Sequence, residues 1–275
     1  MEKRRLLLAA NWKMFPHPGD LKPYKPRKDI DVVVFPTFLD IPTCLKAGLT
    51  VGAQYGHPAD QGAHTGDIAM KMIKELGCTY VLCGHSERRK NHGETNDFVA
   101  AQVLSALKNN LHPILCIGET WEERKALKSK EIVKAQLEAV LKAVQNNPSE
   151  GAGLVGPAPA GHHSRKGGLA GGEPGVSLPR IIAYEPVWAI SGGDASKPAA
   201  SAAEAEEMHA FIRTLLTKFR ISDFGFRILY GGSMKPENAE ELLAQPNIDG
   251  GLVGGASLDP AKFQKIVEAA RLIKK

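Results

Sequence analysis

The chain has 275 residues, of which 43% are hydrophobic and 24% are charged, a composition ordinary for a soluble protein with a sizeable core. Its 35 basic residues only slightly outnumber its 30 acidic ones, which argues weakly for a small anionic ligand and does not favour a nucleic-acid partner. The apolar runs stay well below the roughly 18 residues of a membrane span, so we expect no membrane association.

The four cysteines (Cys44, Cys78, Cys83 and Cys116) form no CxxC pair and no zinc-like spacing with histidine. We therefore predict reduced structural thiols and no bound metal. The apolar run 6–10 that follows the basic N-terminus is too short for the core of a signal peptide. These features together predict a cytoplasmic protein.

Short apolar runs alternate with amphipathic patterns along the chain. The runs read as buried strands because they carry few charges, and they are 6–10, 32–35, 49–53, 80–83, 113–117, 181–184, 227–230 and 251–253. Helical periodicity follows at 96–108, 121–145, 203–220, 236–244 and 260–274. This alternation predicts an α/β fold, a closed (β/α)8 barrel that spans residues 1–275 as a single domain; an open doubly wound sheet is the alternative.

Two segments interrupt this alternation. About 20 residues separate Asn11 from the second strand and hold four prolines, at positions 16, 18, 23 and 26. Because each proline lacks a backbone donor and clashes with the preceding turn, we predict no regular first helix and a partly uncovered barrel wall. The second segment, 146–179, is rich in glycine and proline and poor in large apolar residues. It predicts a disordered or mobile insertion before the sixth strand.

Polar residues follow the first and fourth strands. Lys13 comes just after the first strand, where a parallel barrel places its active site. Taken alone, this residue is better interpreted as a solvated loop lysine. His85 follows the fourth strand and is succeeded by a dense cluster of charged residues. A single histidine is more often structural than catalytic, and this charged cluster at a barrel mouth weakens that preference.

A carboxylate, Glu185, stands directly at the end of the sixth strand, where its desolvation is costly unless it has a partner or a function. Apolar Val187, Trp188 and Ile190 follow, and then the flexible pair 192–193. This order predicts a catalytic carboxylate beside a lid that excludes water.

Two glycine-rich turns follow the seventh and eighth strands, at 230–233 and 253–257. Backbone amides at such turns bind phosphate, and this is the usual phosphate site of a parallel barrel. A single Gly-Gly pair is weak evidence for such a site, whereas two at these positions are strong evidence.

Taken together, these segments closely resemble the triosephosphate isomerase family. The matching stretches are 11–14, 83–89, 113–119, 183–190, 230–238 and 251–258, in the family's order. The resemblance implies a cofactor-free aldose–ketose isomerase of glycolysis and gluconeogenesis, built as a TIM barrel. Its substrates would be dihydroxyacetone phosphate and D-glyceraldehyde 3-phosphate, linked by an enediolate.

The same resemblance implies roles for individual residues. The family's mechanism is a well-known case of acid–base tuning. Glu185 would be the base and His85, as neutral imidazole, the electrophile. Lys13 and Asn11 would stabilise negative charge. Ser86, Glu87 and Cys116 would support these groups, the cysteine by packing. Phosphate would be held by the residues at positions matching the family's grip, namely Ser191, Ser233, Gly254 and Gly255.

The family also forms homodimers, in which a loop of one subunit supports the partner's site. Segment 61–67 matches that loop and Thr65 its reaching residue, so the resemblance implies a homodimer. The lid departs from the family's usual Ala-Ile-Gly-Thr-Gly, since 189–193 reads Ala-Ile-Ser-Gly-Gly. We expect this change to alter lid kinetics and to leave the chemistry intact.

Two rival interpretations remain open on the sequence. A Schiff-base aldolase would need a lysine at an apolar strand end, and Lys13 lies in no such pattern. A degenerate barrel that only binds or scaffolds would lack a key polar group, and every expected one is present.

Overall fold

A computed structural model describes residues 4–147, 180–190, 200–219 and 226–273. Its strands are β1 (Leu7–Asn11), β2 (Asp31–Phe35), β3 (Gly52–Ala53), β4 (Tyr80–Cys83), β5 (His112–Ile117), β6 (Ile181–Tyr184), β7 (Arg227–Tyr230) and β8 (Gly250–Val253). Its α-helices are α1 (Ile41–Lys46), α2 (Met70–Leu76), α3 (Ser86–His92), α4 (Asn96–Lys108), α5 (Trp121–Lys125), α6 (Ser129–Asn146), α8 (Ala202–Lys218), α9 (Pro236–Ala244) and α10 (Pro260–Leu272).

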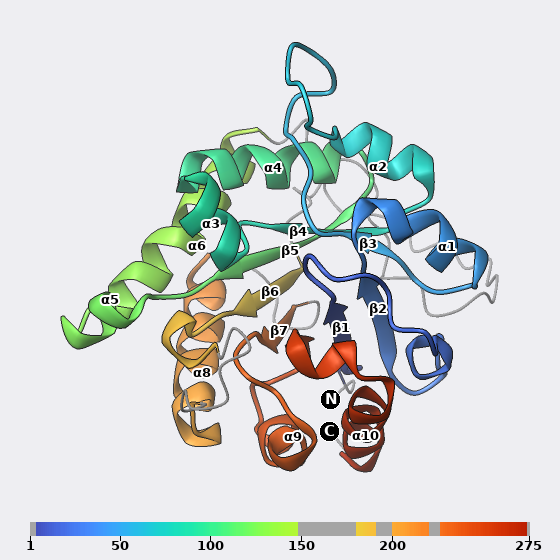
Figure 1. Cartoon of the computed structure of the whole chain (residues 1–275). Helices are drawn as coiled ribbons and strands as arrows, with labels where there is room; N and C mark the ends of the chain where they lie inside the picture. Colours follow the sequence, from blue (N-terminus) through green and yellow to red (C-terminus); the bar gives the residue numbers. More distant parts are fainter. Residues whose placement is uncertain (1–3, 148–179, 191–199, 220–225, 274–275) are drawn as a thin grey trace, which may run out of the picture.

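The strands form one parallel sheet in the order β2-β1-β8-β7-β6-β5-β4-β3. The two edge strands, β2 and β3, approach each other through a parallel bridge between Val34 and Val51, which directly precedes β3. The sheet therefore nearly closes into a barrel. Helices surround it on the outside (Figure 1). This arrangement confirms the (β/α)8 barrel.

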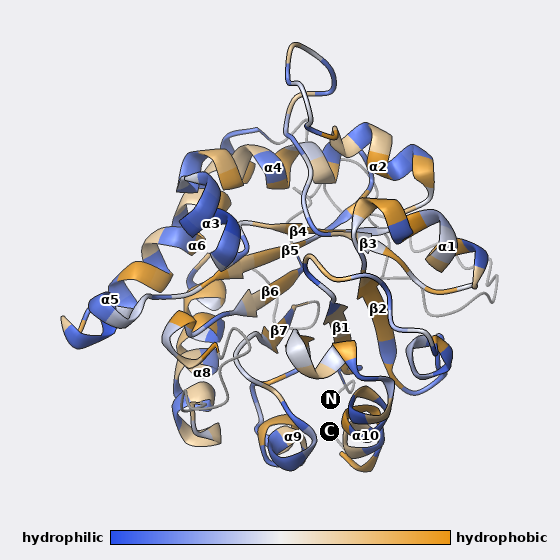
Figure 2. Ribbon diagram, viewed as in Figure 1, coloured by the Kyte–Doolittle hydropathy of each residue, from blue (hydrophilic) through white to orange (hydrophobic). Residues whose placement is uncertain are grey.

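The interior of the barrel is filled by alternate strand residues. Leu7 and Ala9 point inward, whereas Leu8 and Ala10 pack in the outer layer against the helices. The strands are hydrophobic along their length and the surrounding helices mix hydrophobic with hydrophilic residues (Figure 2). The inner layer is Leu7, Ala9, Val33, Phe35, Tyr80, Leu82, Ile114, Cys116, Ile181, Ala183, Leu229 and Leu252.

Most predicted elements agree with the structure, and two differ. The predicted strand 49–53 is regular only over Gly52–Ala53. The predicted helix 121–145 is two helices, α5 and α6, because Leu127 adopts a left-handed backbone with φ +57°. The short helices α1, α2 and α3 were not predicted.

The proline-rich segment (residues 12–30) contains no α-helix, as predicted, and only the 3-10 helix η1 (Lys22–Tyr24). Our expectation that the barrel wall is left uncovered there is wrong, because Tyr24 covers it. The Tyr24 ring is fully buried, stacks on Phe263 at 4.7 Å and meets Trp12 edge-on at 5.3 Å. Its hydroxyl donates a 2.8 Å hydrogen bond to the carbonyl of Ser257.

Two other expectations lie outside the described residues, namely the insertion 146–179, apart from its first two residues, and the lid tip 191–193 with Ser191. No described helix is long and apolar enough to span a bilayer.

Candidate active site

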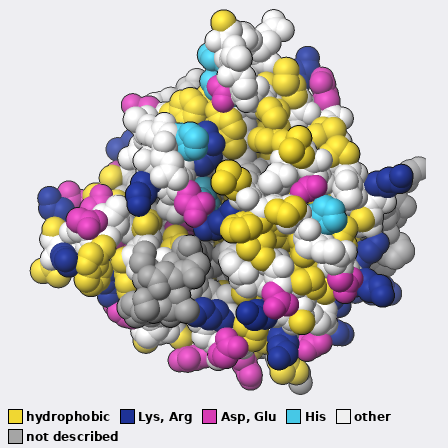
Figure 3. All heavy atoms as spheres, viewed as in Figure 1, with side chains coloured by type: hydrophobic (Ala, Val, Ile, Leu, Met, Phe, Trp, Pro, Cys, Tyr) yellow, Lys and Arg dark blue, Asp and Glu magenta, His cyan; other side chains and the backbone are white. Residues whose placement is uncertain are grey.

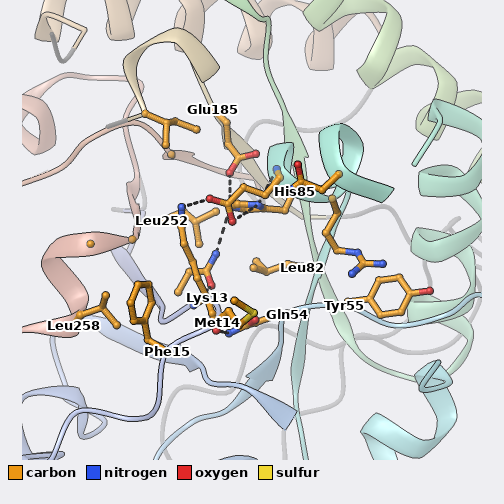
Figure 4. A pocket seen from close by; sticks show the side chains of 18 of the residues that line it. Lys13, Met14, Phe15, Gln54, Tyr55, Leu82, His85, Glu185, Leu252 and Leu258 are labelled. Carbon is orange, nitrogen blue, oxygen red and sulfur yellow. Dashed lines mark hydrogen bonds and ion pairs between the residues drawn. The ribbon is translucent and has the colours of Figure 1, made fainter. Parts of the chain in front are cut away.

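The carboxyl ends of the strands open into a cleft of about 940 Å³. Asn11 and Lys13 enter it from the end of β1, His85 from β4 and Glu185 from β6. Figure 4 shows the side chains of Lys13, His85 and Glu185 converging. The structure thus brings together the four residues that we predicted from separate parts of the sequence.

The Glu185 side chain is 2% exposed. Its Oε2 accepts a 2.8 Å hydrogen bond from the backbone amide of Ser86. The second oxygen, Oε1, receives no hydrogen bond from any described residue, although His85 Nε2 lies 3.0 Å away without hydrogen-bond alignment. One carboxylate oxygen is therefore fixed, and the other keeps lone pairs for a proton.

His85 is the N-cap of α3, and its Nδ1 accepts the backbone N–H of Glu87 at 3.3 Å. Because a neutral imidazole carries one proton, an accepting Nδ1 assigns that proton to Nε2. Nε2 faces the cleft beside Glu185. The amide Nδ2 of Asn11 lies 3.3 Å from it, and because both nitrogens carry hydrogens in this tautomer, that contact is not a hydrogen bond. The local helix geometry thus selects the tautomer that donates into the cleft.

Lys13 has a left-handed backbone with φ +52°, which is unfavourable for a non-glycine residue. Two side chains hold it there: Asn11 Oδ1 accepts its N–H at 3.0 Å, and Gln54 donates to its carbonyl at 2.7 Å. Its ammonium pairs with Glu87 at 2.5 Å. The cation is thereby placed at the mouth of the cleft.

The two predicted glycine turns border the cleft, and the first of them lies against the base, since a side-chain carbon on Gly231 would begin 2.8 Å from Cγ of Glu185. Gly254 and Gly255 begin the 3-10 helix η5 (Gly255–Leu258), and a side chain at Gly255 would meet open space. Ser233 closes the other turn and donates its hydroxyl to the carbonyl of Ala189 at 2.9 Å. The open space at Gly255 leaves room for an anion beside backbone amides.

Cys116 lies beneath this site, inside the barrel, and is fully buried. Burial first, and the nearby Glu185 carboxylate second, raise the pKa of its thiol well above the usual range. A thiol kept protonated in this way packs and does not react as a thiolate.

Near the base lies a buried carboxylate, Glu119, to which the sequence analysis gave no role. Glu119 is fully buried and accepts hydrogen bonds from the Tyr184 hydroxyl at 3.1 Å and from Trp188 Nε1 at 2.9 Å. Burial first, and Glu119 second, raise the Tyr184 pKa. Glu119 follows β5 as Glu185 follows β6, and this parallel could have identified it.

Thr65 is exposed on the loop between β3 and α2, at the outer rim of the cleft. Nearby His57, His64 and Asp67 are the one group among the described residues whose ligand atoms could meet a metal ion. However, His57 Nδ1 accepts the Ala59 amide at 3.1 Å, so the neutral ring keeps its proton on Nε2. We assign no metal there, because a ligating Nε2 would need that proton on Nδ1.

Comparison with known proteins supports one family. The family model described as triosephosphate isomerase matches residues 6–152 and 168–270. Triosephosphate isomerases of Magnetococcus marinus and Moorella thermoacetica are each 40% identical to this chain, with 96% of it and 98% of each relative covered. That of Halorhodospira halophila is 39% identical over 97% of this chain and 98% of the relative. Residues 153–167, which the family model does not match, fall inside the predicted insertion.

Proposed function

The chain belongs to the triosephosphate isomerase family, and we propose that it interconverts dihydroxyacetone phosphate and D-glyceraldehyde 3-phosphate through an enediolate. The observation that carries this proposal is the pairing of Glu185 with His85. A desolvated carboxylate with one unbonded oxygen lies 3.0 Å from an imidazole nitrogen that carries a proton. Such a pair can remove a proton from carbon and support the adjacent carbonyl.

In the proposed reaction, Glu185 Oε1 takes a proton from the carbon next to the substrate carbonyl. The electron pair of the C–H bond moves toward the carbonyl oxygen, where Nε2–H of His85 and the Lys13 ammonium stabilise the developing charge. Glu185 then returns the proton to the neighbouring carbon, after the hydroxyl proton has passed between the two oxygens by way of His85. The sum is a proton shift within the substrate, so the scheme invokes no cofactor.

We place the substrate phosphate at the turns that carry Ser233, Gly254 and Gly255, together with Ser191 by family resemblance. Lys13 lies next to this site, with its Cε 3.3 Å from where a side chain on Gly254 would begin. Its ion pair with Glu87 favours a charged ammonium over the neutral amine of a Schiff-base enzyme.

We further propose a homodimer in the cytoplasm. Met14 and Phe15 follow the strained Lys13 and are 92% and 52% exposed. Hydrophobic side chains gather on this face, near the loop that projects between β3 and α2 (Figure 3). A partner that covers this face would bury these side chains and stabilise Lys13. The four buried, unpaired cysteines fit a reducing compartment.

The proposed function is tested with the purified full chain and each triose phosphate in turn. We expect turnover in both directions, and product formed in D2O should carry deuterium at the carbon that receives the proton. No turnover above that of buffer would refute the function. Turnover without any deuterium uptake would support the isomerase activity but would refute the proposal that Glu185 carries a proton that exchanges with solvent.

A further inference from the structure

Strands β4 and β5 separate just where the active site begins. They pair in register from Tyr80–His112 to Cys83–Leu115. Beyond this point Gly84, with φ +72°, turns the chain out of the barrel so that His85 can cap α3. The last residues of β5 and those that follow it, up to Glu119, therefore have no β4 backbone to bond on that side.

Side chains take the place of the missing strand. Gln136 of α6 accepts the Gly118 N–H at 2.7 Å and donates to the Gly118 carbonyl at 3.0 Å. A primary amide carries both a donor and an acceptor, as a peptide group does, so one glutamine continues the ladder. Next to it, Arg89 of α3 reaches the carbonyl of Cys116 at 3.4 Å. Helix α6 lies on the outer side of β5 (Figure 1).

Residues 117–119 bond the backbone of the proposed base on their opposite edge, the one that faces β6. The carbonyl of Ile117 accepts Glu185 N–H at 2.7 Å, and that of Glu119 accepts Val187 N–H at 3.1 Å. Gly118 lies between them, so close to Glu185 that a side-chain carbon on this glycine would collide with the Glu185 carbonyl. Any shift of Gly118 is therefore transmitted to Glu185.

From this juxtaposition we propose that Gln136 is a positioning residue for the base. It fixes Gly118 from outside the barrel, and Gly118 with its neighbours fixes the peptide from which the Glu185 carboxylate extends. Gln136 does not line the cleft, so it acts through backbone position and not on the substrate. This inference rests on the proposed function of Glu185.

Two substitutions test the role of the amide. In Gln136→Leu both hydrogen bonds to Gly118 are lost at similar volume, and we expect kcat to fall about 10- to 100-fold, the cost of moving a reacting group by up to 1 Å. KM should change less than about threefold, because the phosphate grip is untouched. A purely structural residue would lower the melting temperature and leave kcat of the folded fraction unchanged.

Gln136→Glu supplies a readout specific to the proposed contact. The carboxylate repels the Gly118 carbonyl, whereas the protonated acid again offers one donor and one acceptor. Burial raises the pKa of such a carboxyl, so kcat relative to wild type should rise at least about fivefold between pH 8 and pH 5. The same ratio for Gln136→Leu should not change with pH.

Gln264→Leu is the matched control. Gln264 is a helical glutamine on α10 whose amide bonds Arg27 and Glu268 and no barrel strand, so its kcat should equal that of wild type. The inference is overturned if Gln136→Leu keeps kcat within threefold of wild type, if Gln136→Glu shows no recovery at low pH, or if neither variant folds. Lack of turnover in the wild type would instead refute the proposed function.

Discussion

At the scale of single residues, the site depends on how Glu185 tolerates burial, since no lysine or arginine in the described part of the chain forms an ion pair with it. A buried carboxylate is costly to desolvate, and the only hydrogen bond it receives from the described residues is the Ser86 amide. The carboxylate gains this bond because β4 leaves the barrel at Gly84 and brings the first turn of α3 over it. The same turn sets the tautomer of His85. One backbone departure thus shapes both groups of the proposed acid–base pair.

Gly118→Ala should show how tightly Glu185 is held. Because the added methyl would collide with the Glu185 carbonyl, which is backbone and cannot rotate away, we expect kcat to fall at least about tenfold. Overpacking should lower the free energy of unfolding by about 1–3 kcal/mol. Gly19→Ala, where nothing lies within 4 Å of the new methyl, is the control for steady-state kinetics and thermal melting. Unchanged kcat in Gly118→Ala would contradict the tight contact.

The positions of Glu185, His85 and Lys13 in the cleft could be predicted because each lies within two residues of the end of a buried strand, where parallel barrels place their active-site groups. Gln54 and Gln136 were not. Both act by bonding a backbone that is distant in sequence, and such a contact leaves no periodicity or spacing that a single sequence displays.

At the scale of elements, the proline-rich segment shows how a barrel manages without its first helix. Its prolines prevent a regular helix, and the segment covers the wall instead with Tyr24, which joins Trp12 to Phe263 of α10. The proline argument predicted the missing helix, but nothing in the local sequence indicated where the Tyr24 ring would pack. The break between α5 and α6 was missed for a similar reason, since Leu127 is an unusual residue for a left-handed turn.

Two substitutions of Tyr24 separate its ring from its hydroxyl. Tyr24→Phe loses the hydrogen bond to Ser257 and should reduce the free energy of unfolding by about 1 kcal/mol. Tyr24→Ala also leaves a cavity between Trp12 and Phe263, and should cost about 3–5 kcal/mol. Urea denaturation monitored by circular dichroism measures both. Equal stability of Tyr24→Ala and wild type would show that the segment does not seal the wall.

His112, the first residue of β5, should make the stability of the protein depend on pH. Desolvation first, and then the charges of Lys74, Arg227 and Arg180, lower the pKa of His112 to about 4. The unfolded chain, in which this histidine has an ordinary pKa near 6.5, binds the proton more readily than the folded protein. The contribution of His112 to the free energy of unfolding is therefore fully present above about pH 6.5 and is lost as the pH falls toward 4. After allowance for residual solvent contact, the loss is on the order of 2 kcal/mol.

His112→Asn removes this titration. Between pH 7 and pH 5 its melting temperature should fall less than that of wild type, with both proteins measured in the same buffers. If wild type and His112→Asn lose stability in parallel, another group controls the acid limit.

At the scale of the whole molecule, the proposed dimer would join the exposed Met14 and Phe15 to the loop that carries Thr65. These features lie on one face, around the mouth of the cleft. A subunit docked on this face would contact the segment next to Lys13 at the rim of the mouth, so assembly and activity should be coupled. The sequence alone indicated this interface through family resemblance, since surface patches arise only when distant segments fold together.

Met14→Glu tests the coupling. In analytical ultracentrifugation, the wild-type protein should have a mass of about twice the 29.6 kDa of one chain. A charge buried at the interface should weaken the dimer at least about 100-fold, or about 2.7 kcal/mol, and kcat should fall with dissociation. Leu272→Glu, at an exposed leucine that ends α10, should stay dimeric and active. A monomeric wild type with full activity would contradict the coupling.

The central claim is that Glu185 is the base of an isomerase, and Glu185→Asp tests it most directly. Shortening the side chain by one methylene keeps the charge and withdraws Oε1 from the substrate carbon, so kcat should fall about 100-fold or more in a protein that still folds. Glu207→Asp, at an exposed glutamate of α8, is the matched control and should retain wild-type turnover. The account predicts that only Glu185→Asp loses activity. A folded Glu185→Asp protein with kcat within threefold of wild type would contradict it.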